Sequence, residues 1–279
     1  MAKTARLVIL FMTEFLRPQP ESFNQPQNLG EETEKIDAFE NEVSFCPFCD
    51  GLENDSRFYQ QYPELNGFPQ VLFETESVMV LPDLAPVKSG HILIVPKKHV
   101  TSYAFLDDSC RREFAHVYDR VKQILNKPDT LEFEHGSGFL NNEKTTCGNS
   151  VFHAHWHVIP ISESIEGIKI LDKMLDEIPA DMDFKSIGLR GSLSTESFLT
   201  ELSENSGGYP YLVFSNSDWA VVLREEDNIE VPSQILRRIS ALVLHGEKGR
   251  WNWKNATDND RQIWLDNLRQ TYHLFGYQI

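Results

Sequence analysis

The chain has 279 residues, of which 41% are hydrophobic and 24% charged, with 15 glycines and 14 prolines. This composition is that of a globular protein and excludes collagen, coiled coils and wholesale disorder. No apolar run reaches the roughly 18 residues that a membrane span needs, and the short run from Leu7 to Met12 lacks the cleavage site of a signal peptide. We therefore expect a cytoplasmic protein with no membrane partner.

The charge balance bears on the kind of ligand. Lys and Arg number 26 and Asp and Glu number 42, which gives a formal net charge of −16. Proteins that hold long nucleic acids through many phosphate contacts are usually basic on the binding face. The balance favours a nucleotide-sized ligand, and a nucleic acid partner is not expected.

The first part of the chain is predicted to be an N-terminal lead-in, residues 1–44. Its second half, from Arg17 onward, is rich in Pro, Gln, Asn and Glu and has few large apolar residues, so we expect it to be partly extended. Two paired strands are predicted next, at Val71–Glu74 and Ser77–Leu81. The short apolar run His91–Pro96 is typical of a buried strand.

A helix is predicted after Asp107 or Asp108, because apolar residues recur there at spacings of three and four up to Leu125. Two more strands are predicted at Gly138–Asn141 and Phe152–Ile159, joined by a polar turn. The fold class is therefore α+β, with a mostly antiparallel sheet and helices over residues 45–162.

Residues 163–279 are predicted to form a smaller α/β C-terminal accessory region. It either buries a core of its own or covers the ligand face of the preceding domain. The elements expected in it are a helix over Ile168–Ile178, a loop at about Gly188–Gly208, a hairpin of Tyr211–Phe214 with Trp219–Leu223, a helix from Pro232 to Gly246, and a helix over Asp258–Phe275.

The strongest chemical signal is the run His153-Ala154-His155-Trp156-His157. In a strand, alternate residues share a face, so the three imidazoles would point one way and Trp156 the other. Three imidazoles make a poor core, because each needs partners for two ring nitrogens. An exposed polar sheet face is one interpretation, and metal binding or nucleophilic catalysis by an imidazole are the functional ones.

The Cys46-x-x-Cys49 motif helps to decide between them. Two thiolates and two imidazoles make a closed tetrahedral zinc site, and His99 and His153 are available to complete it. That assignment leaves His155 and His157 for chemistry. A Cys-x-x-Cys motif is also used in redox proteins, but the βαβ context typical of those is not seen here.

Taken together, these motifs resemble the histidine triad family of nucleotidyl hydrolases and transferases. The resemblance covers roughly residues 45–160 and rests on Asp83, on Gly90 to His99, on Asn142, and on Gly148 to Ile159. It implies a sheet-based fold of that family. It also implies that Cys46, Cys49, His99 and His153 bind a structural Zn²⁺ ion.

The resemblance further implies that His155 attacks an α-phosphorus and forms a covalent nucleotidyl-histidine. By the same resemblance, Asp83 faces the ribose hydroxyls, while Asn142, Ser150 and His157 contact the phosphate. Asn149 stands where many members have Gln and is expected among the phosphate ligands. The predicted function is hydrolysis of a nucleotide phosphoanhydride or phosphoramidate, with a purine as the default base.

Two alternatives stay open: a nucleotidyltransferase or phosphorylase that uses the same intermediate, and a nucleotide-binding scaffold with negligible turnover. The intact His157 favours hydrolysis over transfer. The resemblance also leaves open a homodimer, or a chain in which the last 119 residues cover the pairing surface.

The other histidines and the arginine Arg237 are expected to have structural or surface positions. His91 is expected to be a satisfied core residue, and His116 and His135 are expected at the surface. Arg237 is expected on the solvated face of a helix, with a place near the leaving group (shared with Arg238 or Lys254) as the alternative.

Overall fold

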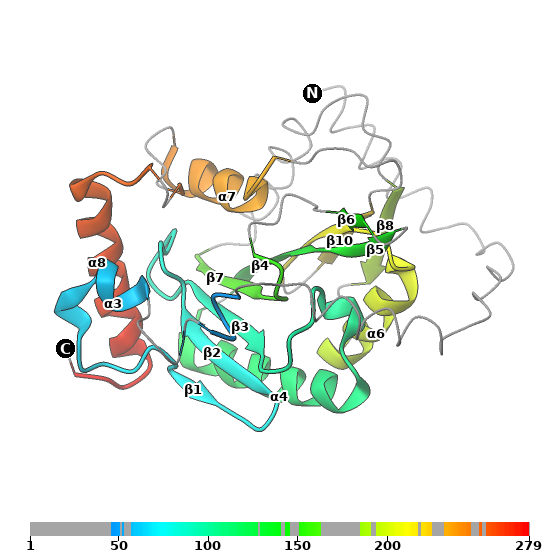
Figure 1. Cartoon of the computed structure of the whole chain (residues 1–279), viewed down its shortest axis with the longest axis horizontal. Coiled ribbons are helices and arrows are strands. Elements are labelled where there is room, and N and C mark those ends of the chain that lie inside the picture. The colour runs from blue at the N-terminus through cyan, green and yellow to red at the C-terminus, as the bar shows by residue number, and fades with distance from the viewer. Residues whose placement is uncertain are drawn as a thin grey trace, which may run out of the picture. The chain divides into compact units, whose positions relative to one another are not determined.

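The computed structural model contains one large sheet (Figure 1). It describes residues 46–50, 52, 57–127, 129–140, 143–145, 151–162, 185–190, 194–216, 219–224, 232–246, 251–252 and 255–278. Within them the strand order is β1-β2-β3-β7-β4-β9-β10-β8, and each neighbouring pair is antiparallel. The strands are β1 Phe73–Glu74, β2 Val78–Pro82, β3 Ile92–Pro96, β4 Asp129–Gly136, β7 Trp156–Ile161, β8 Lys185–Arg190, β9 Tyr211–Ser215 and β10 Trp219–Arg224. The predicted α+β class with a mostly antiparallel sheet is confirmed.

Helices pack around this sheet. They are α3 Arg57–Gln61, α4 Asp108–Leu125, α6 Thr195–Ser206, α7 Ile235–His245 and α8 Asp258–Leu274, with short 3₁₀ turns at Pro63–Leu65 and Tyr103–Phe105. The Asp107 side chain caps α4 by accepting from the Cys110 N–H, and the helix ends at Asn126 in the left-handed conformation (φ 44°). The predicted helix after Asp107 is confirmed. In the described part of the chain, no helix is long and apolar enough to cross a membrane.

Strand alternation gives the sheet two different faces. Trp156 and Val158 on β7 belong to the large core that includes residues of α4 and α6. His157 points to the other face, where its β4 partner is Phe133. His135 lies on this second face, and the N–H of Leu236 in α7 donates to its Nε2 at 3.5 Å. The face that carries His157 and His135, called the triad face below, therefore meets α7, and the opposite face meets α4 and α6 (Figure 1).

Several predicted elements differ from the structure. Strand β4 was not predicted, and His135 within it is buried rather than at the surface, because β4 lies between β7 and β9. Helix α6 occupies much of the predicted loop; Ser194 caps it, and its Leu199 and Leu202 are fully buried. The strand predicted over Phe152–Ile159 begins only at Trp156, so it carries one histidine of the three.

The remaining predictions divide into three groups. The hairpin of β9 with β10 and the two C-terminal helices form as predicted, although α7 begins at Ile235. The strand predicted at Gly138–Asn141 appears as β5 (Gly138–Leu140), paired with β6 (Glu143–Thr145) in a separate two-stranded sheet. The lead-in 1–44 and the helix over Ile168–Ile178 lie outside the described residues. Because β9 pairs with β4, strands from both predicted regions share one sheet.

Gly90 fixes the turn that leads into β3. Its φ of +83° is in the region that favours glycine, and a Cβ there would lie 2.8 Å from Pro160 Cγ and 3.0 Å from Leu125 Cδ2. Its N–H donates to Thr271 Oγ1 of α8 at 2.8 Å. The backbone entering His91 is therefore held between the sheet, α4 and α8.

We predict that Gly90→Ala lowers the free energy of unfolding by about 2–4 kcal/mol, from backbone strain plus overpacking. Gly67→Ala is the matched control, because Gly67 also has a positive φ (+98°) but has no atom within 4 Å of its Cβ position. It is expected to cost only about 1–2 kcal/mol. Urea unfolding of both variants measures the difference, and equal losses would show that the close packing at Gly90 contributes nothing.

Glu134 in β4 is a buried carboxyl on the face away from the triad. It accepts hydrogen bonds from Tyr211 O–H at 2.5 Å and from the Tyr103 N–H at 2.9 Å. Burial raises the pKa of Glu134 to about 8, although these two hydrogen bonds oppose the shift. The folded state therefore holds a proton that the unfolded state releases near the ordinary Glu pKa.

Because the folded pKa is the higher one, stability from this group is present at low pH and is lost as the pH rises toward 8. We predict that Glu134→Gln, which mimics the protonated acid, becomes progressively more stable than the wild type between about pH 5 and pH 8, with a limiting slope of about 1.4 kcal/mol per pH unit. Urea unfolding across this range tests the prediction. A difference that does not change with pH would contradict it.

Candidate active site and metal centre

The three histidines of the His153–His157 run do three different things. His153 lies beside the cysteines, His155 is half-buried just before β7, and His157 is buried on β7 itself. The N–H of Ala154 donates to the Val100 carbonyl at 2.7 Å, which places the run beside His99. The expectation that all three imidazoles share one strand face is wrong, because the strand starts after His155.

The predicted metal ligands are brought together. One donor atom from each of Cys46, Cys49, His99 and His153 lies within 4.8 Å of the others. His153 Nδ1 is 3.4 Å from both sulfurs, and His99 Nδ1 is 3.4 Å from Cys49 Sγ. Zinc bonds of about 2.3 Å to sulfur and about 2.0 Å to nitrogen, at a tetrahedral angle, place the two donors about 3.5 Å apart. The spacing of this Cys/His cluster therefore fits a tetrahedral metal site.

The surroundings prepare these side chains for a metal. His153 Nε2 donates to the Pro96 carbonyl at 2.7 Å, which directs the unprotonated Nδ1 toward the sulfurs. The turn that carries both cysteines is closed by Asp50, whose carboxylate accepts from the Cys46 N–H at 2.7 Å. Burial opposes ionisation of Cys46, but the neighbouring His153 and His99 and the Cys49 backbone outweigh this effect and lower the pKa of the thiol to about 5. The thiolate is the form that binds metal.

His155 has one nitrogen fixed by the backbone. Its Nδ1 lies 2.7 Å from the carbonyl oxygen of His153. A carbonyl only accepts, so Nδ1 carries the proton and Nε2 keeps its lone pair. Burial lowers the pKa of His155 to about 4, against the raising effect of that hydrogen bond. Near pH 7 this imidazole is therefore neutral and has a nucleophilic nitrogen.

His157 is oriented by a chain of hydrogen bonds that begins at the backbone. The N–H of Val87 donates to His91 Nδ1 at 3.1 Å, so in neutral His91 the proton is on Nε2. That Nε2 lies 3.0 Å from His157 Nδ1 and donates to it, which places the His157 proton on its own Nε2. Burial lowers the pKa of His91 to about 4 and also lowers the pKa of His157 well below its usual value. His91 is the satisfied core residue that was expected, but its role in orienting His157 was missed.

Asp83 also lies in this network, with an unexpected partner. Its Oδ2 is 3.7 Å from His91 Nε2 and 3.6 Å from His157 Nδ1, and it forms a close ion pair with Arg237 of α7. Burial disfavours the charged form of Asp83, but Arg237 outweighs this effect and lowers the pKa of the carboxyl. The expectation that Arg237 is solvated is wrong, because α7 carries it onto the triad face. Removing one partner of a buried pair costs about 3–5 kcal/mol.

The remaining predicted phosphate ligands, Asn142, Asn149 and Ser150, lie outside the described residues.

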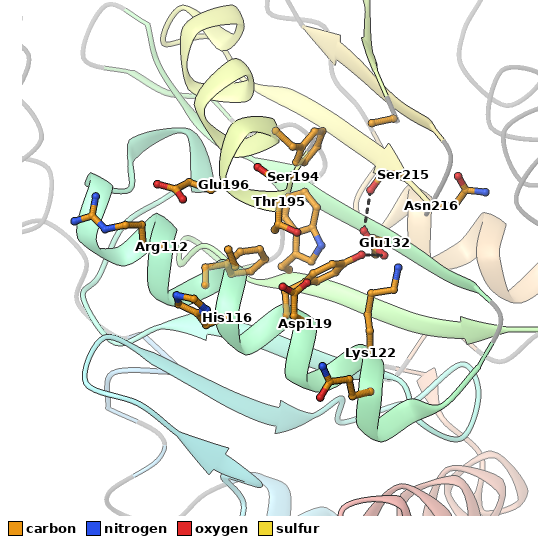
Figure 2. A pocket seen from close by; sticks show the side chains of 17 residues that line it. Arg112, His116, Asp119, Lys122, Glu132, Ser194, Thr195, Glu196, Ser215 and Asn216 are labelled. Atoms are coloured by element: carbon orange, nitrogen blue, oxygen red, sulfur yellow. Dashed lines mark hydrogen bonds between the residues drawn. The ribbon is translucent and has the colours of Figure 1, made fainter. Parts of the chain in front are cut away.

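A cavity of about 600 Å³ opens on the face of the sheet away from His157, between α4, α6 and the strands (Figure 2). Glu132 lines one end of it and accepts from Ser215 at 3.1 Å, and Trp156 forms part of its wall. Trp156 packs against Tyr103 and Phe114, which confirms its expected role on the back of the triad segment.

Comparison with known proteins gives a family. A family model described as HIT domain matches residues 68–164. An uncharacterised HIT-like protein of Mycoplasma genitalium is 30% identical over 127 residues, which is 46% of this chain and 80% of that protein. One of Methanocaldococcus jannaschii is 33% identical over 117 residues, 39% of this chain and 88% of that protein.

Among solved structures, a yeast Ap4A phosphorylase is similar with a TM-score of 0.40 and 12% identity, covering 85% of this chain and 81% of that one. The sequence relatives decide the family, because most of their length is matched at 30% identity or more. The chain belongs to the HIT, or histidine triad, family.

Proposed function

We propose that the chain hydrolyses a nucleotide phosphoanhydride or phosphoramidate through a covalent nucleotidyl-histidine on His155. The observation that carries this proposal is the 2.7 Å hydrogen bond from His155 Nδ1 to the His153 carbonyl. This bond leaves Nε2 as the one nitrogen of that ring with a lone pair. The default base is a purine, as the family resemblance implies.

In the first step, His155 Nε2 forms a bond to the α-phosphorus while the bond from that phosphorus to the leaving group breaks. His157 Nε2–H donates a hydrogen bond to a phosphoryl oxygen, because its own Nδ1 is engaged by His91. Asn142, Asn149 and Ser150 are proposed as further phosphate ligands. In the second step, the oxygen of a water molecule forms a bond to the same phosphorus, the N–P bond breaks with its electron pair returning to His155 Nε2, one water proton is released to solvent, and the nucleoside 5′-phosphate leaves.

We also propose that Cys46, Cys49, His99 and His153 hold a structural Zn²⁺ ion. The 3.4 Å spacing of donors and the thiolate character of Cys46 support this assignment. Four protein ligands leave no open position, so the ion would supply stability rather than a reactive water. It would tie the segment that carries His155 to the turn that carries the cysteines.

His155→Ala is predicted to abolish the covalent adduct and to reduce turnover by at least about a thousandfold, because the nucleophile is lost. Intact-mass analysis after incubation with AMP-morpholidate detects the adduct, and product release from diadenosine polyphosphates measures turnover. His116→Ala is the matched control, since His116 is exposed on α4 away from the triad. Activity of His155→Ala within tenfold of wild type would contradict the assignment.

Adding inorganic phosphate to the same assay separates the alternatives. Under the hydrolase proposal the product is the nucleoside monophosphate and its yield does not depend on phosphate. A nucleoside diphosphate formed at the expense of the monophosphate would make the chain a phosphorylase. Nucleotide binding with neither product would make it a scaffold.

Cys46→Ser is predicted to lower zinc content from about one ion per chain to near zero and to reduce thermal stability, because a structural site contributes folding free energy. Cys110→Ser is the matched control: Cys110 is also buried, but it belongs to α4 and the core. It is expected to lose some stability and keep the metal. Elemental analysis measures the zinc content, and thermal unfolding measures the stability. Equal zinc content in the two variants would contradict the assignment of Cys46 as a zinc ligand.

A further inference from the structure

The carboxylate of Asp83 is fully engaged by protein groups. Its Oδ1 accepts from the Ala85 N–H at 2.8 Å, and its Oδ2 is paired with Arg237 Nη2. The Asp83 side chain is 1% exposed, and that of Arg237 is 9% exposed. In this arrangement, a ligand hydroxyl cannot reach either oxygen of Asp83.

Arg237 is itself held in place at several points. Its Nη1 donates to the Ala85 carbonyl at 2.9 Å, so the guanidinium spans the carboxylate and the backbone beside it. At the far end of α7, His245 Nε2 donates to the Val87 carbonyl of the same loop at 2.7 Å. Displacing Arg237 therefore means breaking a buried ion pair and separating α7 from the loop at residues 83–87.

A sugar diol is read by a carboxylate that offers its oxygens to the hydroxyls, as acidic residues do for ribose in dinucleotide-binding proteins. Asp83 is the residue that the family resemblance places in this role. In this chain, Oδ2 of Asp83 is paired with Arg237, which lies in α7, beyond residue 162. The two uses of the carboxylate compete.

We propose that Arg237 withholds Asp83 from the nucleotide sugar, so that the triad site accepts nucleoside 5′-phosphates with or without 2′- and 3′-hydroxyls. This inference rests on the proposed nucleotide site at His155 and narrows its substrate class. The site then distinguishes substrates by their base and their phosphate tail. Deoxynucleotide substrates are used about as well as ribonucleotide substrates.

The test compares the dissociation constants of AMP and 2′,3′-dideoxy-AMP for the full chain by calorimetry. The wild type is expected to bind both within about threefold. Arg237→Ala frees Oδ2 of Asp83 and is expected to favour AMP by about tenfold or more, the effect of one hydrogen bond to a charged acceptor. Arg261→Ala removes an exposed arginine of α8 and is expected to leave the wild-type ratio unchanged.

A wild type that prefers AMP by tenfold or more, with the preference abolished in Asp83→Asn, would overturn the inference. If Arg237→Ala does not fold, the inference is tested by the ratio of the two dissociation constants in the wild type. That ratio is then expected to be the same in Asp83→Asn. Binding of both nucleotides, together with no adduct on His155 after incubation with AMP-morpholidate, refutes the proposed reaction and leaves the sugar inference standing. Binding of neither nucleotide overturns both.

Discussion

The hydrogen bond between His155 Nδ1 and the carbonyl oxygen of His153 determines which nitrogen of the central histidine can react. The position of that carbonyl depends on the His153 side chain, whose Nδ1 faces the two cysteines and whose Nε2 donates to Pro96. The Cys/His cluster and the proposed nucleophile are thus separated by one residue of backbone. Loosening the Cys/His cluster would therefore misalign His155 without touching its ring.

The charges around the triad are balanced within the site. His91 and His155 have pKa values lowered to about 4, mainly by burial, while the negative charge of Asp83 acts in the opposite direction. Arg237 compensates that charge and adds to the lowering at His91, His155 and His157. A phosphate group entering the proposed site would therefore meet neutral imidazoles, so N–H donors must provide its stabilisation.

The sequence was sufficient to predict the residues of the Cys/His cluster, because short motifs carry them; the catalytic role of His155 stays a prediction. It was not sufficient for Arg237, which meets Asp83 across 154 positions; its helix alone does not show which face is buried. Strand β4 was missed for a related reason. Its Glu132 and Glu134 are acidic yet buried, and they are satisfied by Ser215 and Tyr211 of β9. Such long-range partners are not visible in a local pattern.

The residues beyond 162 cannot be regarded as an appendage to a complete triad domain. Strand β9 covers the edge of β4, and Thr271 of α8 accepts the N–H of Gly90 at the entrance to β3. Without them, β4 would expose unpaired backbone groups, and Asp83 would lose the positive charge that balances it. The C-terminal region that completes the sheet thus also determines the charge environment of Asp83 beside His91 and His157. Fold stability and the ionic state of Asp83 are therefore coupled in this chain through α7.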